Sequence, residues 1–287
     1  MFLLLLLLLL EFPVFLGEVI MLAAVEKGDV KELAEVVRQD PNMDHDGDGH
    51  ASLHLACTKS SRSPLIPLLL AHPDIDVNLK DTFGWTPFFW ACRAGHPSCV
   101  REMLKDSRVD VNEPDFYGRT PLWRAASSGH LDAIQWWIAS GREMDLGTPG
   151  DVDQTDAIGK ANKIEVWHSA ADRRHKTEIA TLLERFQSDA AQTRHQVRVE
   201  LCWYDKAAAE MFALAVFASD GLLQTKDVTS TPAARYYSIA RKLPLELQMV
   251  LCFRQVDSTK EIIPGKDSEV AFKSLAESLL WPSIFTN

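Results

Sequence analysis

The feature that most constrains this sequence is a set of identical residues that return 34 positions further along the chain. The recurring segments are Gly84-Trp85-Thr86-Pro87 with Gly118-Arg119-Thr120-Pro121, Gly95-His96 with Gly129-His130, and Asp76-Val77-Asn78 with Asp110-Val111-Asn112. A fixed period of this length is typical of proteins built by stacking small supersecondary units. The period therefore predicts that function depends on the surface which the stacked units form together.

Each unit predicts a loop, a helix, a turn, a second helix and another loop. Thr86 followed by Pro87 predicts a helix start, since threonine caps helices and proline is favoured at the first helical position. Gly95 predicts the end of that helix. Apolar residues recur at helical spacing in both helices, with Phe88, Ala91 and Cys92 in the first and Val100, Met103 and Leu104 in the second.

These residues resemble the ankyrin repeat, whose pattern is Asp-x-x-Gly-x-Thr-Pro-Leu-His-x-Ala-Ala, then Gly-His, then Asp-Val-Asn. The match is specific over residues 46–146 and weaker over 18–45. The resemblance implies an all-α solenoid of about four to five helix-turn-helix repeats. After residue 186 the period ends, and the apolar pattern there predicts a small helical domain that follows the repeats. Phe89 and Trp123 depart from the pattern because they stand where the family usually has histidine. Ser60 replaces the inter-helix glycine, so we expect a looser turn there.

We expect three regions along the chain: an apolar segment over 1–17, ankyrin repeats over 18–186, and a helical module over 197–287, joined by the polar stretch 187–196. The expected repeats are 18–45, 46–80, 81–114, 115–148 and 151–186. The last repeat is about 12 residues longer than the period, which indicates an insertion near 162–174. Further helices are expected at 155–161, around 176–183, at 205–219, from 231, from 243, and at 268–280.

The charge and cysteine content bear on the class of partner and on the compartment. The chain carries 30 basic and 40 acidic residues, for a net charge of −10. Such a surface repels a phosphate backbone on average, so no nucleic-acid partner is expected. Five loosely spaced cysteines do not suggest a disulfide framework. We expect reduced thiols and a cytoplasmic location.

The amino terminus conflicts with that location. Residues 3–10 are all leucine, and Glu11 and Pro13 follow. The run is too short to cross a membrane, but its length fits the apolar region of a secretory signal peptide. No basic residue precedes it, and no clear small-residue cleavage site follows. Two interpretations stay open: a secretory signal or anchor, or an extended start of the chain that packs on the first repeat or extends away from it. A membrane is not an expected partner under the second interpretation.

Two clusters imitate metal sites, yet we expect no metal and no cofactor. Residues 44–49 have the Asp and Gly spacing of a calcium loop, but Leu55 stands where a bidentate Glu is needed. Cys92, His96 and Cys99 offer three zinc-like ligands without a fourth nearby. The repeat register already explains both sets as loop and helix positions.

We expect no catalytic residues. His72-Pro73-Asp74 imitates the J-domain tripeptide but lies in a loop between repeats. No nucleophile elbow, phosphate loop or metalloprotease motif is present. In the aromatic pair Trp136-Trp137, the register predicts that Trp137 is buried and Trp136 half exposed.

Partners of the ankyrin family usually meet the hairpin tips and the concave face of the first helices. Carried over by register, that surface predicts a protein-binding set: Phe83, Trp85, Arg93, Phe116, Tyr117 and Arg119. Aromatic residues and arginine are enriched among interface anchors, so we expect these side chains to face solvent and bind another protein. The alternative is that some of the rings pack against neighbouring hairpins.

The carboxyl-terminal module leaves two other functions open. Leu243-Pro244-Leu245-Glu246-Leu247 resembles the first helix of an F-box, which implies a substrate adaptor of a cullin-type ubiquitin ligase through residues 243–281. The following half of that motif is poorly matched, and a helix start explains the same letters. An uncharacterised enzyme activity in this module is the remaining alternative.

Overall fold

The computed structural model describes residues 42, 47–72, 74–147, 156–163, 169–219, 236, 239–240, 242–256, 258, 260 and 262–280. The chain divides into two compact units, Met1–His195 with Ile284–Asn287, and Gln196–Ser283. All regular structure in the described ranges is helical, as the resemblance implied. The leucine run over 3–10 lies outside these ranges, so its role stays a prediction.

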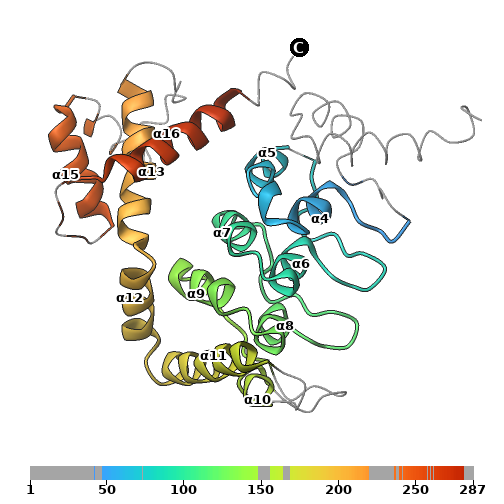
Figure 1. The fold of residues 1–287 in the computed structure, drawn as a ribbon. Helices are drawn as coiled ribbons and strands as arrows, with labels where there is room; N and C mark the ends of the chain where they lie inside the picture. The colour runs from blue at the N-terminus through green and yellow to red at the C-terminus, as the bar shows by residue number, and fades with distance from the viewer. Residues whose placement is uncertain are drawn as a thin grey trace, which may run out of the picture. The chain divides into compact units, whose positions relative to one another are not determined.

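The first unit is a stack of helix pairs (Figure 1). The pairs are α4 (Ser52–Cys57) with α5 (Leu65–Leu70), α6 (Pro87–Ala94) with α7 (Pro97–Lys105), α8 (Pro121–Ser128) with α9 (Leu131–Ser140), and α10 (Ala157–Asn162) with α11 (Ala170–Ser188). The first helices pack in the order α4, α6, α8, α10, and the second helices pack in the order α5, α7, α9, α11. Contacts between successive pairs are those of a solenoid.

The helices begin and end at the predicted residues. The Oγ1 atoms of Thr86 and Thr120 accept the N–H groups of Phe89 and Trp123, each at 3.2 Å. A proline follows each threonine at the first helical position. Gly95 and Gly129 end these helices with φ of 67° and 77°, values that side chains on other residues disfavour.

The turn at Ser60 is longer than the glycine turns, and a buried arginine holds it. Residues Ser60–Arg62 form a 3₁₀ helix, and α5 begins only at Leu65. The Arg62 guanidinium donates to the carbonyl oxygen of Leu55 at 3.0 Å and to Thr58 Oγ1 at 3.1 Å. These bonds give the turn fixed partners, so the looser turn expected from the missing glycine is not what the structure shows.

The core follows the register. Trp137 is fully buried and meets Phe88 edge to face, with ring centroids 5.0 Å apart. Trp136 is half-buried, with the Arg101 guanidinium 5.4 Å from its ring. The predicted division of this pair between core and surface is therefore confirmed.

The helices α10 and α11 lie where the fifth unit was expected. Asp156 caps α10 by accepting the Gly159 N–H at 2.7 Å. Ser169 and Asp172 cap α11 reciprocally, with N–H to oxygen distances of 3.1 and 3.0 Å. Residues 170–174, expected inside an insertion, are the first residues of α11. The polar stretch 187–196 is also largely helical, because α12 spans Ala190–Glu200.

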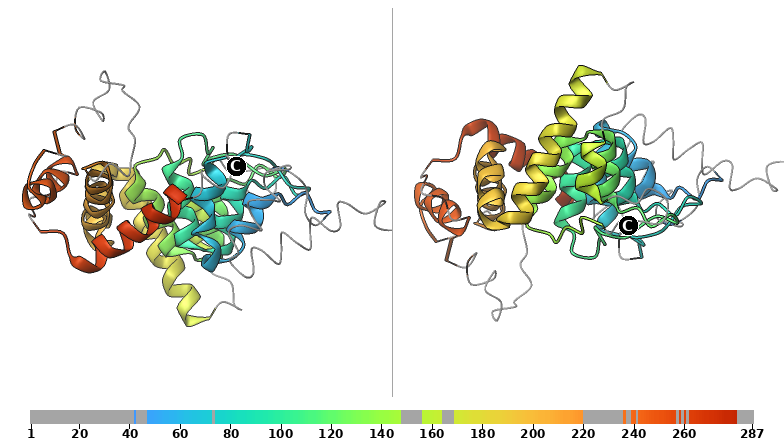
Figure 2. Two further views of the ribbon diagram at one scale, coloured as in Figure 1. Left: turned by 90° about the horizontal axis from the view of Figure 1, so that it is seen from above. Right: turned by 90° about the horizontal axis from the view of Figure 1, so that it is seen from below.

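The second unit is built around α13 (Trp203–Ser219), which packs on α15 (Leu245–Gln255) and α16 (Gly265–Leu280) (Figures 1 and 2). Its buried cluster consists of Ala208, Ala209, Phe212, Ala213, Cys252, Phe253, Ile263 and Ala271. The helices expected near 205–219, after 243 and over 268–280 are present, while most of the one expected from 231 lies outside the described residues. In the part of the chain that is described, no helix has the length and apolar character needed to cross a membrane.

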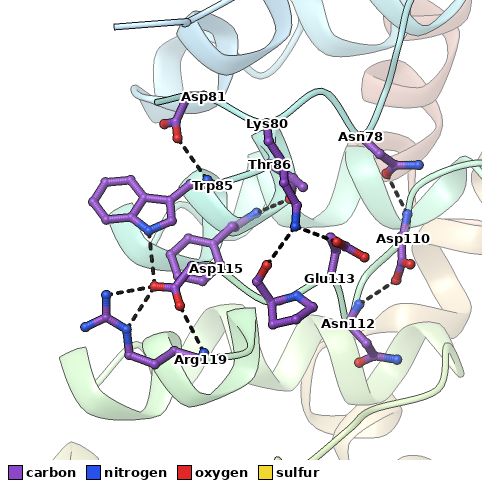
Figure 3. A network of polar contacts seen from close by, with 12 residues as sticks. Asn78, Lys80, Asp81, Trp85, Thr86, Asp110, Asn112, Glu113, Asp115 and Arg119 are labelled. Carbon is purple, nitrogen blue, oxygen red and sulfur yellow. Dashed lines mark hydrogen bonds and ion pairs between the residues drawn. The ribbon is translucent and has the colours of Figure 1, made fainter. Parts of the chain in front are cut away.

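Asparagine side chains tie each inter-repeat loop to the next. Asn78 Nδ2 donates to the Arg108 carbonyl oxygen at 2.9 Å, and its Oδ1 accepts the Asp110 N–H at 2.8 Å. Asn112 makes the same pair of bonds one period later, with Glu143 at 3.4 Å and Asp145 at 2.9 Å. Figure 3 shows Asn78, Asp110 and Asn112 in this ladder. The Asp-Val-Asn motif therefore joins repeats as well as forming a loop.

Replacing Asn78 by Ala should lower the free energy of unfolding by about 1–3 kcal/mol, because two backbone groups of the next loop lose their partner. Urea unfolding followed by circular dichroism measures the change. Asn162→Ala, at an exposed position at the end of α10, is the matched control and should change stability by less than about 0.5 kcal/mol. Equal effects of the two substitutions would contradict a linking role for Asn78.

Candidate protein-binding surface

Two consecutive hairpins carry exposed aromatic rings at their tips. Phe83 is 46% exposed, Phe116 68% and Tyr117 58%. Among the described residues of the first unit, these three are the exposed large hydrophobic side chains. The hairpin loops extend to one side of the helix stack (Figures 1 and 2). Half of the predicted binding set thus faces solvent as expected.

A buried aspartate at the base shapes each hairpin. Asp81 Oδ1 accepts the N–H groups of Phe83 and Trp85, both at 2.8 Å. Asp115 Oδ1 accepts the equivalent N–H groups of Tyr117 and Arg119 at 2.9 and 3.0 Å. Both aspartates are 4% exposed. Each carboxylate holds its loop in a tight turn. The turn places at the tip the two residues that precede the glycine, which include Phe83 in one hairpin and both Phe116 and Tyr117 in the next.

Phe116 lies against the preceding hairpin even though most of its surface is exposed. A Cβ atom added at Gly84 would lie 2.7 Å from Phe116 Cγ, and Gly84 has a φ of 77°. Glycine is therefore needed at position 84 for two reasons, the backbone conformation and the close ring. Lys80 joins the same pair of loops through Glu113 Oε1 at 2.6 Å and the Pro114 carbonyl oxygen at 3.1 Å (Figure 3).

Trp85 is half-buried, so the expectation that it faces solvent is only partly correct. Its ring lies 4.9 Å from the Phe83 ring and 5.6 Å from the nearly parallel Phe89 ring. Its Nε1 donates to Asp115 Oδ2 in the next hairpin at 3.3 Å (Figure 3). Phe89 occupies the position where the repeat pattern has histidine, and it supplies the apolar surface on which Trp85 packs.

Arg93 is held between two tryptophans. Its guanidinium carbon lies 4.8 Å from the ring of Trp85 and 4.8 Å from that of Trp90. The two rings meet nearly at right angles, 5.1 Å apart. Trp90 is anchored in turn by donating from Nε1 to Asp81 Oδ2 at 2.7 Å. Among the described residues, no carboxylate lies within ion-pair distance of Arg93, and the faces of the two rings attract its charge instead.

Arg119 differs from Arg93 because a carboxylate neutralises it. Arg119 Nε and Nη2 reach Asp115 Oδ2 at 2.8 and 2.7 Å. Its guanidinium also lies 4.6 Å from the Tyr117 ring. The Asp115 carboxylate therefore binds Arg119, Trp85 and the backbone of its own hairpin at the same time. The predicted set forms two clusters, Phe83 with Trp85 and Arg93, and Phe116 near Tyr117 with Arg119, joined through Asp115.

Trp90, Trp123 and Lys160 belong to the same surface and were not in the predicted set. Lys160 Nζ lies 4.5 Å from the ring of Trp123, which Arg119 approaches to 5.8 Å. The sequence held a signal for this, because Trp90 and Lys160 both occupy their first helix four residues after its capping residue, Thr86 or Asp156. The contact between Lys160 and Trp123 could not be predicted from one repeat alone, because the two residues belong to neighbouring repeats.

The residues of the zinc-like and J-domain-like motifs have other roles. Cys92 and Cys99 are buried, and burial raises the pKa of both thiols, that of Cys99 to about 11. His96 Nε2 lies 2.9 Å from the Thr58 carbonyl oxygen, in the preceding repeat. His72 Nδ1 accepts the Asp74 N–H at 3.2 Å. No group of three metal-binding side chains occurs in the described ranges; residues 44–46 of the calcium-like loop lie outside them.

His54 is a buried neutral histidine that links two repeats. Its Nδ1 accepts the Ala51 N–H at 3.2 Å, so Nε2 carries the proton and donates to the Trp85 carbonyl oxygen at 3.1 Å. Burial is the main cause that lowers the pKa of His54 to about 4. Protonation of Nδ1 would place its N–H against the Ala51 N–H, so that two donors face each other and the hydrogen bond is lost. The neutral ring therefore supports the backbone of Trp85 at the base of the binding surface.

Acidification should destabilise the first unit through His54. Because its pKa falls from 6.5 to about 4 on folding, the unfolded chain binds the proton more tightly, and stability is lost as pH falls below 6.5. Between pH 6.5 and 5 the free energy of unfolding should drop by up to about 2 kcal/mol from this group.

Denaturant unfolding of His54→Gln at both pH values tests this expectation. Glutamine does not titrate, so the variant should show a shallower pH slope than the unchanged chain. His175→Gln, at an exposed position, is the control and should keep the full slope. An unchanged slope in His54→Gln would contradict the assignment.

Comparison with known proteins agrees with this geometry. The family model of three ankyrin repeats matches residues 53–148. Mouse SMC5-SMC6 complex localization factor protein 1 is 46% identical over 57 residues, which is 20% of this chain and 5% of that protein. Ankyrin repeat domain-containing protein SAT10 of Stachybotrys chartarum is 36% identical over 61 residues, 21% of this chain and 3% of that protein. The aligned segments therefore span a small fraction of these relatives.

A solved structure described as an ankyrin repeat protein, EF0377, is also similar. It shares 24% sequence identity, covers 58% of this chain and 80% of its own, and superposes with a TM-score of 0.47.

Proposed function

Residues 53–148 of this chain are ankyrin repeats, and we propose that they form a non-enzymatic scaffold that binds another protein through the tips of two hairpins. One observation carries the proposal: Phe83, Phe116 and Tyr117 are exposed together on consecutive hairpins, while the other large hydrophobic side chains described in this unit are buried or half-buried. Exposed aromatic residues grouped on a rigid scaffold are typical of protein interfaces.

The contacts beneath the tips favour a preformed surface. Asp81 and Asp115 hold the hairpin backbones, and Trp85 joins the two hairpins through Asp115. A surface that is ordered before binding loses less conformational entropy when the partner docks. Trp85 and Arg119 serve mainly to hold this surface, and the exposed rings supply contact area.

A substrate adaptor of a cullin-type ubiquitin ligase is a second candidate because of α15. Leu245 and Leu247 are 53% and 52% exposed, next to the Pro244 that precedes the helix. Exposed leucines on a helix offer a docking face for another subunit. Trp281, the other residue of the F-box resemblance, lies outside the described ranges.

For the second unit we propose a structural or docking role in place of catalysis. Its buried cluster is made of alanine, phenylalanine, isoleucine and one cysteine. Burial raises the pKa of the Cys252 thiol, whose Sγ lies 3.1 Å from Tyr236 Oη. A protonated, buried thiol is a poor nucleophile.

We also propose a reducing, cytoplasmic setting for the repeats. All five cysteines are free, and Cys57, Cys92 and Cys99 are buried in the first unit. Buried free thiols in a small helical repeat need no oxidising compartment to fold. A secretory role for residues 1–17 is the alternative, and the location of the full-length chain carrying a fluorescent tag distinguishes the two.

Affinity purification from native lysate with two double variants separates the scaffold from the adaptor. Phe116→Ser with Tyr117→Ser should remove the bound partners, because both rings are more than half exposed and their loss leaves the hairpin hydrogen bonds in place. Leu245→Ser with Leu247→Ser is the matched change in the second unit. It should leave those partners bound.

The opposite pattern would support the adaptor. In that case the linker subunit of the ligase co-purifies with the unchanged chain and is lost on the leucine substitutions. An unaltered set of co-purified proteins after the Phe116 and Tyr117 changes would contradict the hairpin-tip surface. Circular dichroism of each variant establishes that the fold is intact.

A further inference from the structure

We propose that the face formed by the first helices binds an extended acidic segment of the partner protein. This first-helix face consists of Trp85, Trp90, Arg93, Trp123, Arg124 and Lys160. The inference rests on the proposed binding function and specifies the chemistry of what is bound. Carboxylates of the segment meet Arg93, Arg124 and Lys160, and its apolar side chains meet the exposed tips.

The charge on this face is opposite to that of the chain. The whole sequence has a net charge of −10, yet the face presents three cations from three consecutive first helices. In the part of the chain that the structure describes, the carboxylates at the bases of the two hairpins are buried and bonded within the fold. Asp81 is 4% exposed and binds Phe83 N–H, Trp85 N–H and Trp90 Nε1. Asp115 is equally buried and is satisfied by Arg119 and by backbone N–H groups.

Arg93 is the best-defined anchor of this face. Its guanidinium is fixed at 4.8 Å from both Trp85 and Trp90, and its Nε is buried without a hydrogen-bond partner. The side chain is nevertheless only half-buried, and no described carboxylate pairs with it. An arginine already held by two rings loses little rotamer entropy on binding, and its planar donors fit a carboxylate with two parallel hydrogen bonds.

Trp123 supports a cation one repeat further on. Its ring is buried, and Lys160 Nζ lies over it at 4.5 Å. The family pattern has histidine at this position. The indole in its place gives the ammonium of Lys160 an aromatic contact that orients it. The same combination of ring and cation thus occurs in two neighbouring layers of the stack.

The spacing of the layers indicates the spacing of acids in the partner. Helices pack about 8–10 Å apart, so cations on successive first helices are separated by a similar distance. An extended chain advances about 3.3 Å per residue. Acidic residues about three positions apart therefore match consecutive repeats.

Selection from a library of random peptides displayed on phage, against the immobilised full chain, tests this chemistry. The expected result is enrichment of Asp and Glu about three positions apart, with aromatic or aliphatic residues beside them. A synthetic, fluorescent consensus peptide is then titrated by anisotropy at low and high salt. Its affinity should fall with added salt, because screening weakens charge pairs.

Matched variants locate the binding. Arg93→Gln should weaken the consensus peptide about tenfold, since one charge-assisted contact is lost. Arg93→Lys keeps the charge and should recover part of that loss. Lys105→Gln, an exposed position on α7 away from the first helices, should leave the affinity unchanged. Replacing the acids of the peptide by their amides should reproduce the loss seen with Arg93→Gln.

The outcomes separate this inference from the proposed function. Selected peptides that lack acids, yet lose binding when Phe116 and Tyr117 become serine, overturn the acidic partner and leave the hairpin-tip surface standing. Peptides whose affinity is unchanged by the Arg93 substitutions and by the Phe116 and Tyr117 substitutions overturn both this inference and the proposed function. A selection that returns no binding peptide, or an oligothymidine that binds more tightly than the consensus peptide, also overturns the inference.

Discussion

The hydrogen bonds that side chains make from one loop to the next are the constraint on which the binding surface depends. Asn78 and Asn112 each accept one backbone N–H and donate to one carbonyl oxygen of the following loop. Loops have few apolar contacts of their own, so their order must come from such bonds. The hairpin tips are exposed, and these bonds hold the loops beside them in register.

A second set of contacts, made by aromatic side chains of the first helices, shapes the binding surface that these loops hold in place. Most ankyrin repeats place a histidine where this chain has Phe89 and Trp123, and His54 keeps that role in the preceding repeat. The aromatic replacements exchange a hydrogen bond to the backbone for apolar area. Trp85 packs on Phe89, and Lys160 lies over Trp123. Of these two departures, Trp123 contacts Lys160 directly, and Phe89 supports Trp85, one of the two rings beside Arg93.

The local features of the fold could be predicted from the sequence because each depends on neighbouring residues alone. Thr86 and Thr120 cap their helices, Gly95 and Gly129 end them, and Trp137 is buried, as the register required. The half-burial of Trp85 could not be predicted in the same way. It arises from Asp115, thirty residues further along the chain, and from Phe89 beneath the ring.

Side-chain bonds between repeats were likewise invisible in the pattern. The Asp-Val-Asn motif predicts a loop, but its sequence does not show that the asparagine side chain bonds to the next loop. The turn at Ser60 was expected to be loose because glycine is missing, but Arg62 supplies bonds that glycine could not. For the candidate site, exposure was predicted correctly for Phe83, Phe116 and Tyr117.

Site-specific photo-crosslinking in living cells tests the central claim most directly, since it reports which surface meets a partner without removing any contact in the core. A photoreactive phenylalanine analogue at position 116 should give a covalent adduct with another protein. The same analogue at position 262, where Ile262 is 75% exposed in the second unit, should give none. An adduct from position 262 together with none from position 116 would contradict the account.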